Sequence, residues 1–210
     1  MLKRLFFWSY AAMYDLFNAS AERAGLRAQR HDLLAEATGA TIEIGAGTGL
    51  NLVHYPPAVT RLVLIEPDPY MRERLRRRAA RLGRDAEILD ATADRLPLPD
   101  ASFDTAVVTF TLCSVPDEQA ALNEVTRVLA PGGRLLFLEH VRSADPRVAA
   151  KQDKMPFPYP LIGCHPNRDT LGEIRSSPLA VESVREGELP KAPAIERPMI
   201  VGTARRPSSA

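Results

Sequence analysis

The order of apolar and polar positions predicts strands alternating with helices over most of the chain. Short runs of aliphatic and β-branched residues are typical of buried strands. Such runs begin at residue 40 and occupy 61–67, 86–91, 103–110 and 134–141. Segments 70–82 and 117–129 have helical spacing, and residues 1–39 are also predicted to be helical, with Gly39 as the terminator.

The last third of the chain follows a different pattern. Residues 151–166 are rich in proline and predict an irregular loop, and 169–176 predicts a short helix. Segments 179–189 and 197–206 predict two strands joined by a turn, which form an antiparallel pair at the sheet edge. The whole pattern therefore predicts a Rossmann-like α/β fold: a seven-stranded, mostly parallel sheet with helices on both faces and an antiparallel C-terminal strand pair.

Length and charge narrow the class of protein. The chain has 210 residues and a formal net charge of +1, which predicts a single domain and no nucleic-acid partner. Within it, 1–39 is an N-terminal helical lid region, 40–205 the α/β domain and 206–210 a flexible tail. Arginines crowd 71–85, which predicts a solvated helix face, with a patch for phosphate or anionic lipid as the alternative.

The two cysteines and the N-terminus bear on localisation. Cys113 and Cys164 are far apart and form no CxxC pair, so we expect neither a disulfide framework nor a metal site. A reducing compartment, the cytoplasm, is the corresponding expectation. Polar breaks at Ser9 and Asp15 leave too short a core for a membrane span. The first segment therefore predicts an amphipathic helix, with contact at a membrane surface as the alternative.

A glycine-rich turn follows the first predicted strand and carries the strongest chemical signal. It extends from Glu43 to Asn51, and its glycines allow a sharp turn and close approach to a ligand. Glu66 ends the next strand, where an acid accepts hydrogen bonds from ribose hydroxyls. Glu43 just before the glycines would repel the pyrophosphate of a dinucleotide, but it favours the ammonium and sulfonium of S-adenosylmethionine.

The arrangement ExGxGxG, with an acid at the end of the next strand, resembles the class I S-adenosylmethionine-dependent methyltransferases. The segments LPLPDASFD (96–104) and RVLAPGGRLLFLEHV (127–141) are similar to the ubiquinone/menaquinone-biosynthesis group. TLCSV (111–115), EHV (139–141) and GCHPNRDT (163–170) resemble the membrane-associated thiol methyltransferase branch and its bacterial relatives. The resemblance spans residues 10 to 204 and implies S-adenosyl-L-methionine as the cofactor.

The resemblance also implies which residues bind that cofactor. The glycine loop would lie beneath the methionine moiety held by Glu43, Glu66 would bind the ribose, and Pro67 with Asp68 would shape the adenine edge. Where the family has G-D-A-E, this chain has Ala91-Thr92-Ala93-Asp94, which leaves the backbone amide of Ala93 as the adenine contact. The implied cofactor set is Tyr14, Glu43, Gly45, Ala46, Gly47, Gly49, Asn51, Glu66, Pro67, Thr92, Ala93 and Thr109. Tyr14 would be a lid residue, with simple helix packing as its alternative.

Catalytic residues carry less signal. Transfer of a methyl group from a sulfonium depends mainly on positioning, but a thiol or hydroxyl acceptor needs a base. His140 at the end of the fifth strand is the first candidate, and His165, with Asp169 as a partner, is the second. A structural hydrogen bond is the alternative for each histidine, and packing is expected for both cysteines.

The expected acceptor is a small hydrophobic molecule: a thiol, a quinol or phenol, or a lipid-like compound. Apolar residues in 151–166, including Phe157 and Tyr159, and others in the first helix predict an apolar pocket. An NAD-linked oxidoreductase and a cofactor-binding protein without turnover are the alternative functions. The sequence leaves the oligomeric state open.

Overall fold

The structure is a computed structural model that describes residues 2–155 and 163–208. The chain opens with helices α1 (Leu2–Ala21) and α2 (Arg27–Leu34), joined by a π-helical turn at Glu22–Leu26. The strands are β1 (Gly39–Ile44), β2 (Val59–Ile65), β3 (Glu87–Leu89), β4 (Phe103–Thr109), β5 (Leu129–His140), β6 (Ala180–Glu188) and β7 (Pro198–Arg205). The other helices are a 3-10 turn (Leu50–Val53), α3 (Pro69–Leu82), α4 (Glu118–Val128), α5 (Pro146–Gln152) and α7 (Thr170–Ser176).

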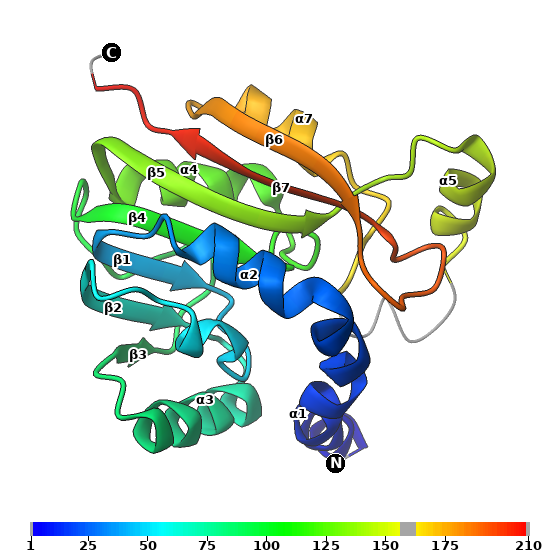
Figure 1. Cartoon of the computed structure of the whole chain (residues 1–210), viewed down its shortest axis with the longest axis horizontal. Coiled ribbons are helices and arrows are strands. Elements are labelled where there is room, and N and C mark those ends of the chain that lie inside the picture. Colours follow the sequence, from blue (N-terminus) through cyan, green and yellow to red (C-terminus); the bar gives the residue numbers. More distant parts are fainter. Residues whose placement is uncertain (1, 156–162, 209–210) are drawn as a thin grey trace.

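All seven strands form one sheet in the order β3-β2-β1-β4-β5-β7-β6 (Figure 1). Strands β1 to β5 pair in parallel, whereas β7 pairs antiparallel with both β5 and β6. The predicted fold, including the antiparallel C-terminal pair, is therefore confirmed. Strand order reverses between β1 and β4, so their carboxyl ends form the edge at which such sheets bind ligands.

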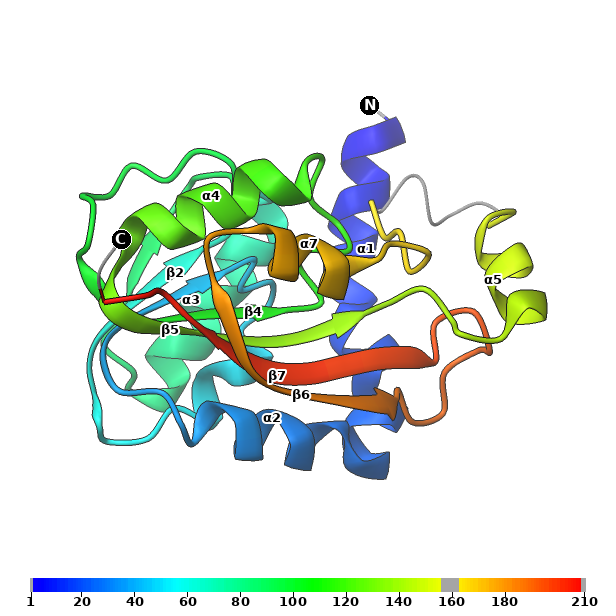
Figure 2. The same cartoon turned by 90° about the horizontal axis from the view of Figure 1, so that it is seen from above.

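Helices cover both faces of the sheet, and the strands alternate accordingly. Ile42 and Ile44 of β1 pack on the side of α4 and α7, whereas Val107 of β4 packs on the side of α2 and α3. Figure 2 shows α4 and α7 on one side of the sheet and α2 on the other. Among the described residues, none of the helices is both long and apolar enough to span a membrane.

Aspartate caps explain where four helices begin. The side chain of Asp68 accepts from the backbone N–H groups of Tyr70 and Met71, and each bond is 2.8 Å long. Aspartates at 117, 145 and 169 cap α4, α5 and α7 in the same way. Helix α5 ends two residues inside the loop predicted at 151–166. No helix is predicted at 146–150, although an aspartate followed by proline is a start signal.

The N-terminal helical region differs from its prediction in two respects. Gly25 has φ of 131°, which interrupts the helix between α1 and α2. Helix α2 ends at Leu34, and Gly39 begins β1 with φ of 65° instead of ending a helix. A Cβ at Gly39 would lie 2.1 Å from Oδ2 of Asp104, so close packing against β4 also requires glycine there.

Candidate cofactor site

The glycine loop lies at the carboxyl edge of the sheet, directly after β1. Gly45 and Gly47 have φ of 71° and 56°, the left-handed region that favours glycine. A Cβ at Gly45 would lie 2.5 Å from Oγ1 of Thr111, whereas a Cβ at Gly47 would meet no atom within 4 Å. The loop therefore packs against the end of β4 at one glycine and borders open space at the next.

Glu66 reaches back from the end of β2 to this loop. Its Oε2 accepts from the backbone N–H of Gly47 at 2.7 Å, and its Oε1 accepts from that of Asp68 at 2.8 Å. The residue is 6% exposed, and burial raises the pKa of its carboxyl above the ordinary value. Each oxygen retains a lone pair, so the carboxylate can still accept two hydrogen bonds from a ligand.

Glu43 lies deeper, with each oxygen already hydrogen-bonded. Asn51 Nδ2 donates to Oε1 at 2.9 Å, and the Tyr55 hydroxyl donates to Oε2 at 2.6 Å. The residue is 2% exposed, and burial raises the pKa of Glu43 to about 7. Its charge therefore depends on pH near neutrality and on any cation that binds beside it.

Arg30 of α2 is a site residue that the sequence did not reveal. It is 3% exposed, and its Nη1 donates to Asn51 Oδ1 at 3.0 Å and to Thr109 Oγ1 at 3.1 Å. Its Nε donates to Glu22 Oε1 at 2.9 Å. The only sequence signal was an arginine on the face of a helix that packs on the sheet. The site consequently holds a buried cation as well as a buried acid.

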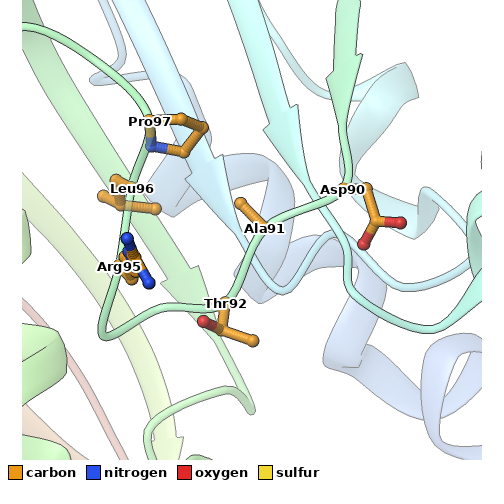
Figure 3. Close-up of a pocket in the computed structure, with 6 residues that line it drawn as sticks. All are labelled: Asp90, Ala91, Thr92, Arg95, Leu96 and Pro97. Carbon is orange, nitrogen blue, oxygen red and sulfur yellow. The ribbon is translucent and has the colours of Figure 1, made fainter.

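One cavity lies at the glycine loop, and a second lies in the segment after β3. The smaller, about 20 Å³, has a lining that includes much of the predicted cofactor set: Tyr14, Arg30, Glu43, Gly45, Ala46, Gly47, Thr48, Leu50, Asn51 and Thr109. The larger, about 530 Å³, is lined by Asp90, Ala91, Thr92, Arg95, Leu96 and Pro97 (Figure 3). Ala93 is buried beside the larger cavity, whereas Gly49, Glu66 and Pro67 of the predicted set line neither.

Helix α1 is held over the loop by a polar contact. The Thr48 hydroxyl donates to Asp15 Oδ1 at 2.6 Å, and Arg78 of α3 forms an ion pair with the same aspartate. Figure 1 shows α1 on the side towards which the arrowheads of β1 and β4 point. The N-terminal helix thus closes the smaller cavity from the direction of the carboxyl edge.

His140 ends β5 at the same edge, but its neighbours differ from those expected. Its Nδ1 lies 3.7 Å from Sγ of Cys113 and 3.8 Å from Sγ of Cys164, so the fold brings the two distant cysteines together. Its ring packs on Phe110 with a centroid separation of 4.5 Å. The Arg30 guanidinium lies 5.4 Å from the centroid of the Phe110 ring. Phe110 therefore lies between His140 and the cofactor-site arginine.

Asp169, the predicted partner of His165, has a structural role at the start of a helix. Asp169 accepts from the backbone N–H of Gly172 at 3.0 Å as the cap of α7. The backbone N–H of His165 donates to the carbonyl of Cys113 at 2.7 Å, and its side chain is partly exposed. Phe157 and Tyr159, predicted to line the acceptor pocket, lie outside the described residues.

A glycine-rich loop after β1, with an acid at the end of β2, defines a Rossmann-like protein that binds a nucleoside-containing cofactor. A family model described as "Methyltransferase domain" matches residues 42–137. Rat thiol S-methyltransferase TMT1B is 32% identical over 164 residues, which cover 75% of this chain and 67% of that protein. The chain therefore belongs to the class I S-adenosylmethionine-dependent methyltransferases.

Other relatives agree with this family. Human thiol S-methyltransferase TMT1B is 34% identical over 127 residues, 55% of this chain, and the alignment spans about half (52%) of the human protein. The Pseudomonas fluorescens ubiquinone/menaquinone biosynthesis C-methyltransferase UbiE is 29% identical over 194 residues, 79% of this chain and 75% of that protein. The chain thus lies in the group that includes thiol and quinone-biosynthesis methyltransferases.

Solved structures confirm the fold. A Thermotoga maritima S-adenosylmethionine-dependent methyltransferase, described as a possible histamine N-methyltransferase, has a TM-score of 0.68 at 22% identity and covers 95% of this chain and 97% of its own. The [4+2]-cyclase SpnF has a TM-score of 0.69 at 20% identity, with 86% and 81% covered. Because one of these proteins is a cyclase, the fold alone does not define the reaction.

Proposed function

We propose that the protein transfers a methyl group from S-adenosylmethionine to a small hydrophobic acceptor: a thiol, a quinol or phenol, or a lipid-like molecule. The observation that carries the proposal is that Glu43 and Arg30 both line one small cavity beside the glycine loop. A buried carboxylate and a buried guanidinium match the ammonium and carboxylate of an amino-acid group such as methionine. NAD, the cofactor of the alternative function, has no such group.

The rest of the cofactor would extend along the loop. The two remaining lone pairs of Glu66 suit two ribose hydroxyls, and the open space at Gly47 lets a ligand approach the backbone. The larger cavity has the volume for an adenine ring, with Thr92 in its wall and the backbone amide of Ala93 beside it. We therefore assign the loop to the methionine end and residues 90–97 to the adenine end.

The acceptor site would adjoin Phe110 and His140. Phe110 has φ of 55°, which is unusual for a bulky residue, and strained residues concentrate at functional sites. His140 Nε2 is buried and makes no hydrogen bond within the described part of the chain, so a bound molecule could partner it. Of the two candidate histidines, only His140 contacts the ring that adjoins Arg30. We therefore favour His140 over His165.

Helix α1 supports a second element of the proposal, contact with an anionic membrane surface. Trp8, Leu16 and Phe17 are 54%, 68% and 60% exposed on this helix. Helix α1 packs beside α3, on which Arg76, Arg77 and Arg81 are exposed. An exposed apolar helix that packs beside an arginine-rich one fits the boundary between acyl chains and acidic headgroups. A cytoplasmic protein at a membrane surface would meet hydrophobic acceptors there.

The experiment that tests the proposal is a comparison of cofactors and acceptors. S-adenosylhomocysteine should raise the melting temperature, because a ligand that binds only the folded state stabilises it, and NAD at the same concentration should not. Transfer of labelled methyl groups should then be measured with alkyl thiols, quinols and phenols. A shift with NAD alone would contradict the cofactor assignment. Cofactor binding without transfer to any acceptor would favour the binding protein without turnover.

A further inference from the structure

Cys113, His140 and Cys164 form a cluster that the cofactor site does not use. One ligating atom from each residue lies within 4.8 Å of those of the other two. Cys113 is 1% exposed and His140 is 8% exposed, whereas Cys164 is partly exposed. The three come from the loop after β4, the end of β5 and the segment before α7. Only the fold brings them together, so the three residues form no zinc motif along the chain.

The two nitrogen-to-sulfur distances in the cluster are close to those between ligands of one tetrahedral metal ion. With Zn–S near 2.3 Å and Zn–N near 2.0–2.1 Å, tetrahedral angles place the sulfur and nitrogen ligands about 3.6 Å apart. The observed separations from His140 Nδ1 are 3.7 Å to Cys113 and 3.8 Å to Cys164. Small shifts would bring both sulfurs to the separation from Nδ1 that one ion requires, and the two sulfurs lie within 4.8 Å of each other.

Direct hydrogen bonding accounts for part of the cluster, because the two thiols also contact each other and Cys113 Sγ lies 3.6 Å from the Ser114 hydroxyl. A neutral imidazole Nδ1 has either one lone pair or one hydrogen, so it can form one good hydrogen bond with a thiol. Here two sulfur atoms approach the same nitrogen at nearly equal distances. A shared cation would satisfy both sulfurs and the nitrogen at once. Two thiolates and a neutral histidine would also balance the charge of a divalent ion in this buried position.

The backbone around the cluster is held in place without any ion. The Glu139 carboxylate is fully buried and accepts from the backbone N–H groups of Thr111, Leu112 and Cys113 at 2.8, 3.0 and 3.3 Å. The backbone bond from His165 to Cys113 holds the Cys164 segment against that turn. Such outer hydrogen bonds orient ligands in metal sites. The ligands are therefore arranged before a metal binds.

We propose that Cys113, His140 and Cys164 bind one thiophilic divalent cation, Zn²⁺ in the first instance, and leave a fourth coordination position open. Two sulfurs and one imidazole nitrogen are the ligands that zinc prefers over magnesium or calcium. Three protein ligands with an open position are typical of catalytic zinc sites rather than of structural ones. The assignment gives His140 a ligand role in place of that of a free base.

The open coordination position of the cation narrows the class of acceptor. This conclusion about the acceptor rests on the proposed methyl transfer. A thiol that coordinates the cation releases its proton to water and is held as a thiolate. The thiolate sulfur then forms a bond to the methyl carbon, while the bond from that carbon to the sulfonium breaks and leaves S-adenosylhomocysteine. The cation is neither oxidised nor reduced. Among the three acceptor classes, the cluster therefore favours a thiol.

The test is stoichiometric metal binding by the reduced protein of residues 1–210. After chelator treatment, Zn²⁺ added against a chromophoric competitor should bind at one equivalent, and Co²⁺ should give a thiolate-to-cobalt charge-transfer absorption. Cys164→Ser, at the partly exposed position, should weaken binding by at least about 100-fold, because a ligand is lost. His165→Asn, the control next to Cys164, should bind like the natural protein. Circular dichroism would verify that both variants are folded.

The outcomes separate the inference from the proposed function. Absence of zinc binding, or binding that survives both Cys113→Ser and Cys164→Ser, would overturn the inferred metal site. So would a mass two hydrogens lower in the protein kept under reducing conditions, which would show a disulfide instead. Because these measurements need neither cofactor nor acceptor, failure of methyl transfer would not affect them. If zinc binds but its removal leaves thiol methylation unchanged, the site stands and the acceptor assignment is wrong.

Discussion

Glu66 combines two tasks at the level of a single residue, because it orders the glycine loop and keeps lone pairs for a ligand. In Glu66→Ala, affinity for S-adenosylhomocysteine should fall at least about tenfold, since each charge-assisted bond contributes about 1.5–3 kcal/mol. Isothermal titration calorimetry would measure the loss. Glu87→Ala, which removes an exposed acid from β3, should bind normally. Unchanged affinity in Glu66→Ala would show that the ribose lies elsewhere.

The titration of Glu43 gives a second prediction at this scale. Burial raises its pKa to about 7, and the cofactor's ammonium would favour the ionised form. Below about pH 7 binding must expel a proton, so affinity should fall by up to about tenfold per pH unit and level off above it. Calorimetry between about pH 6 and pH 8 checks this. Glu43→Gln should lose most of the pH dependence, and an equal slope in that variant would contradict the assignment.

The same raised pKa affects folding stability with a definite sign. Between the ordinary pKa of 4.5 and the folded value of about 7, the folded protein binds more protons at Glu43 than the unfolded chain does. The contribution of Glu43 to the free energy of unfolding is therefore full below about 4.5 and decreases as the pH rises towards 7. A carboxylate that destabilises the fold near neutrality is consistent with a role in binding.

Sequence could predict the loop residues and both acids, because their spacing around one strand is local. Arg30 and the cysteine cluster could not be predicted in this way. Arg30 reaches Thr109 across 79 positions of sequence, and Cys164 reaches His140 across 24. Which distant side chains meet depends on helix placement and loop path, and neither is encoded in a short motif. The capping of α7 by Asp169, the expected partner of His165, is a competing local use of that side chain.

At the scale of elements, the antiparallel pair at the sheet edge depends on a glycine. A Cβ at Gly202 of β7 would lie 2.2 Å from the Ser183 carbonyl oxygen and 2.6 Å from the Phe137 ring. Gly202→Ala should therefore lower the free energy of unfolding by about 1–3 kcal/mol through overpacking. At Gly187 of β6 the nearest atom would be 3.8 Å away, so Gly187→Ala should change stability by less than about 0.5 kcal/mol. Urea unfolding measures both, and equal effects would contradict the packing argument.

Most elements could be predicted, and the differences have local causes. Buried strands and capped helices give strong signals, so β4, α4 and β7 lie within a few residues of their predicted bounds. Strand β5 starts at Leu129 rather than at 134, because residues before the Pro-Gly-Gly turn already pair with Phe103 of β4. The break at Gly25 was missed because an isolated glycine within a helical pattern is ambiguous.

At the scale of the whole molecule, the apolar side chains of α1 predict binding to membranes. The double variant Leu16→Ser, Phe17→Ser should weaken binding to phosphatidylserine vesicles at least about tenfold, since burying each side chain contributes about 1.5–3 kcal/mol. Co-sedimentation would measure it. Val184→Ser on β6, also exposed but far along the chain from α1, is the control. If neither the natural protein nor the control binds vesicles, the exposed apolar side chains of α1 do not bind membranes.

The docking of α1 has a consequence for the timing of cofactor exchange. The cavity beneath the helix holds about 20 Å³, room for little more than a water molecule, so we expect α1 to shift when methionine enters. The observed association rate of S-adenosylhomocysteine should then stop rising at high ligand concentration, at a ceiling set by the opening of the helix. Trp8, the chain's single tryptophan, lies on α1 and would report this by stopped-flow fluorescence. Asp15→Asn weakens the contact with Arg78 and should raise the maximum association rate. If the observed rate rises linearly with ligand concentration in both proteins, the helix does not control entry. Release of the methylation product would pass through the same opening, so this helix would set an upper limit on turnover.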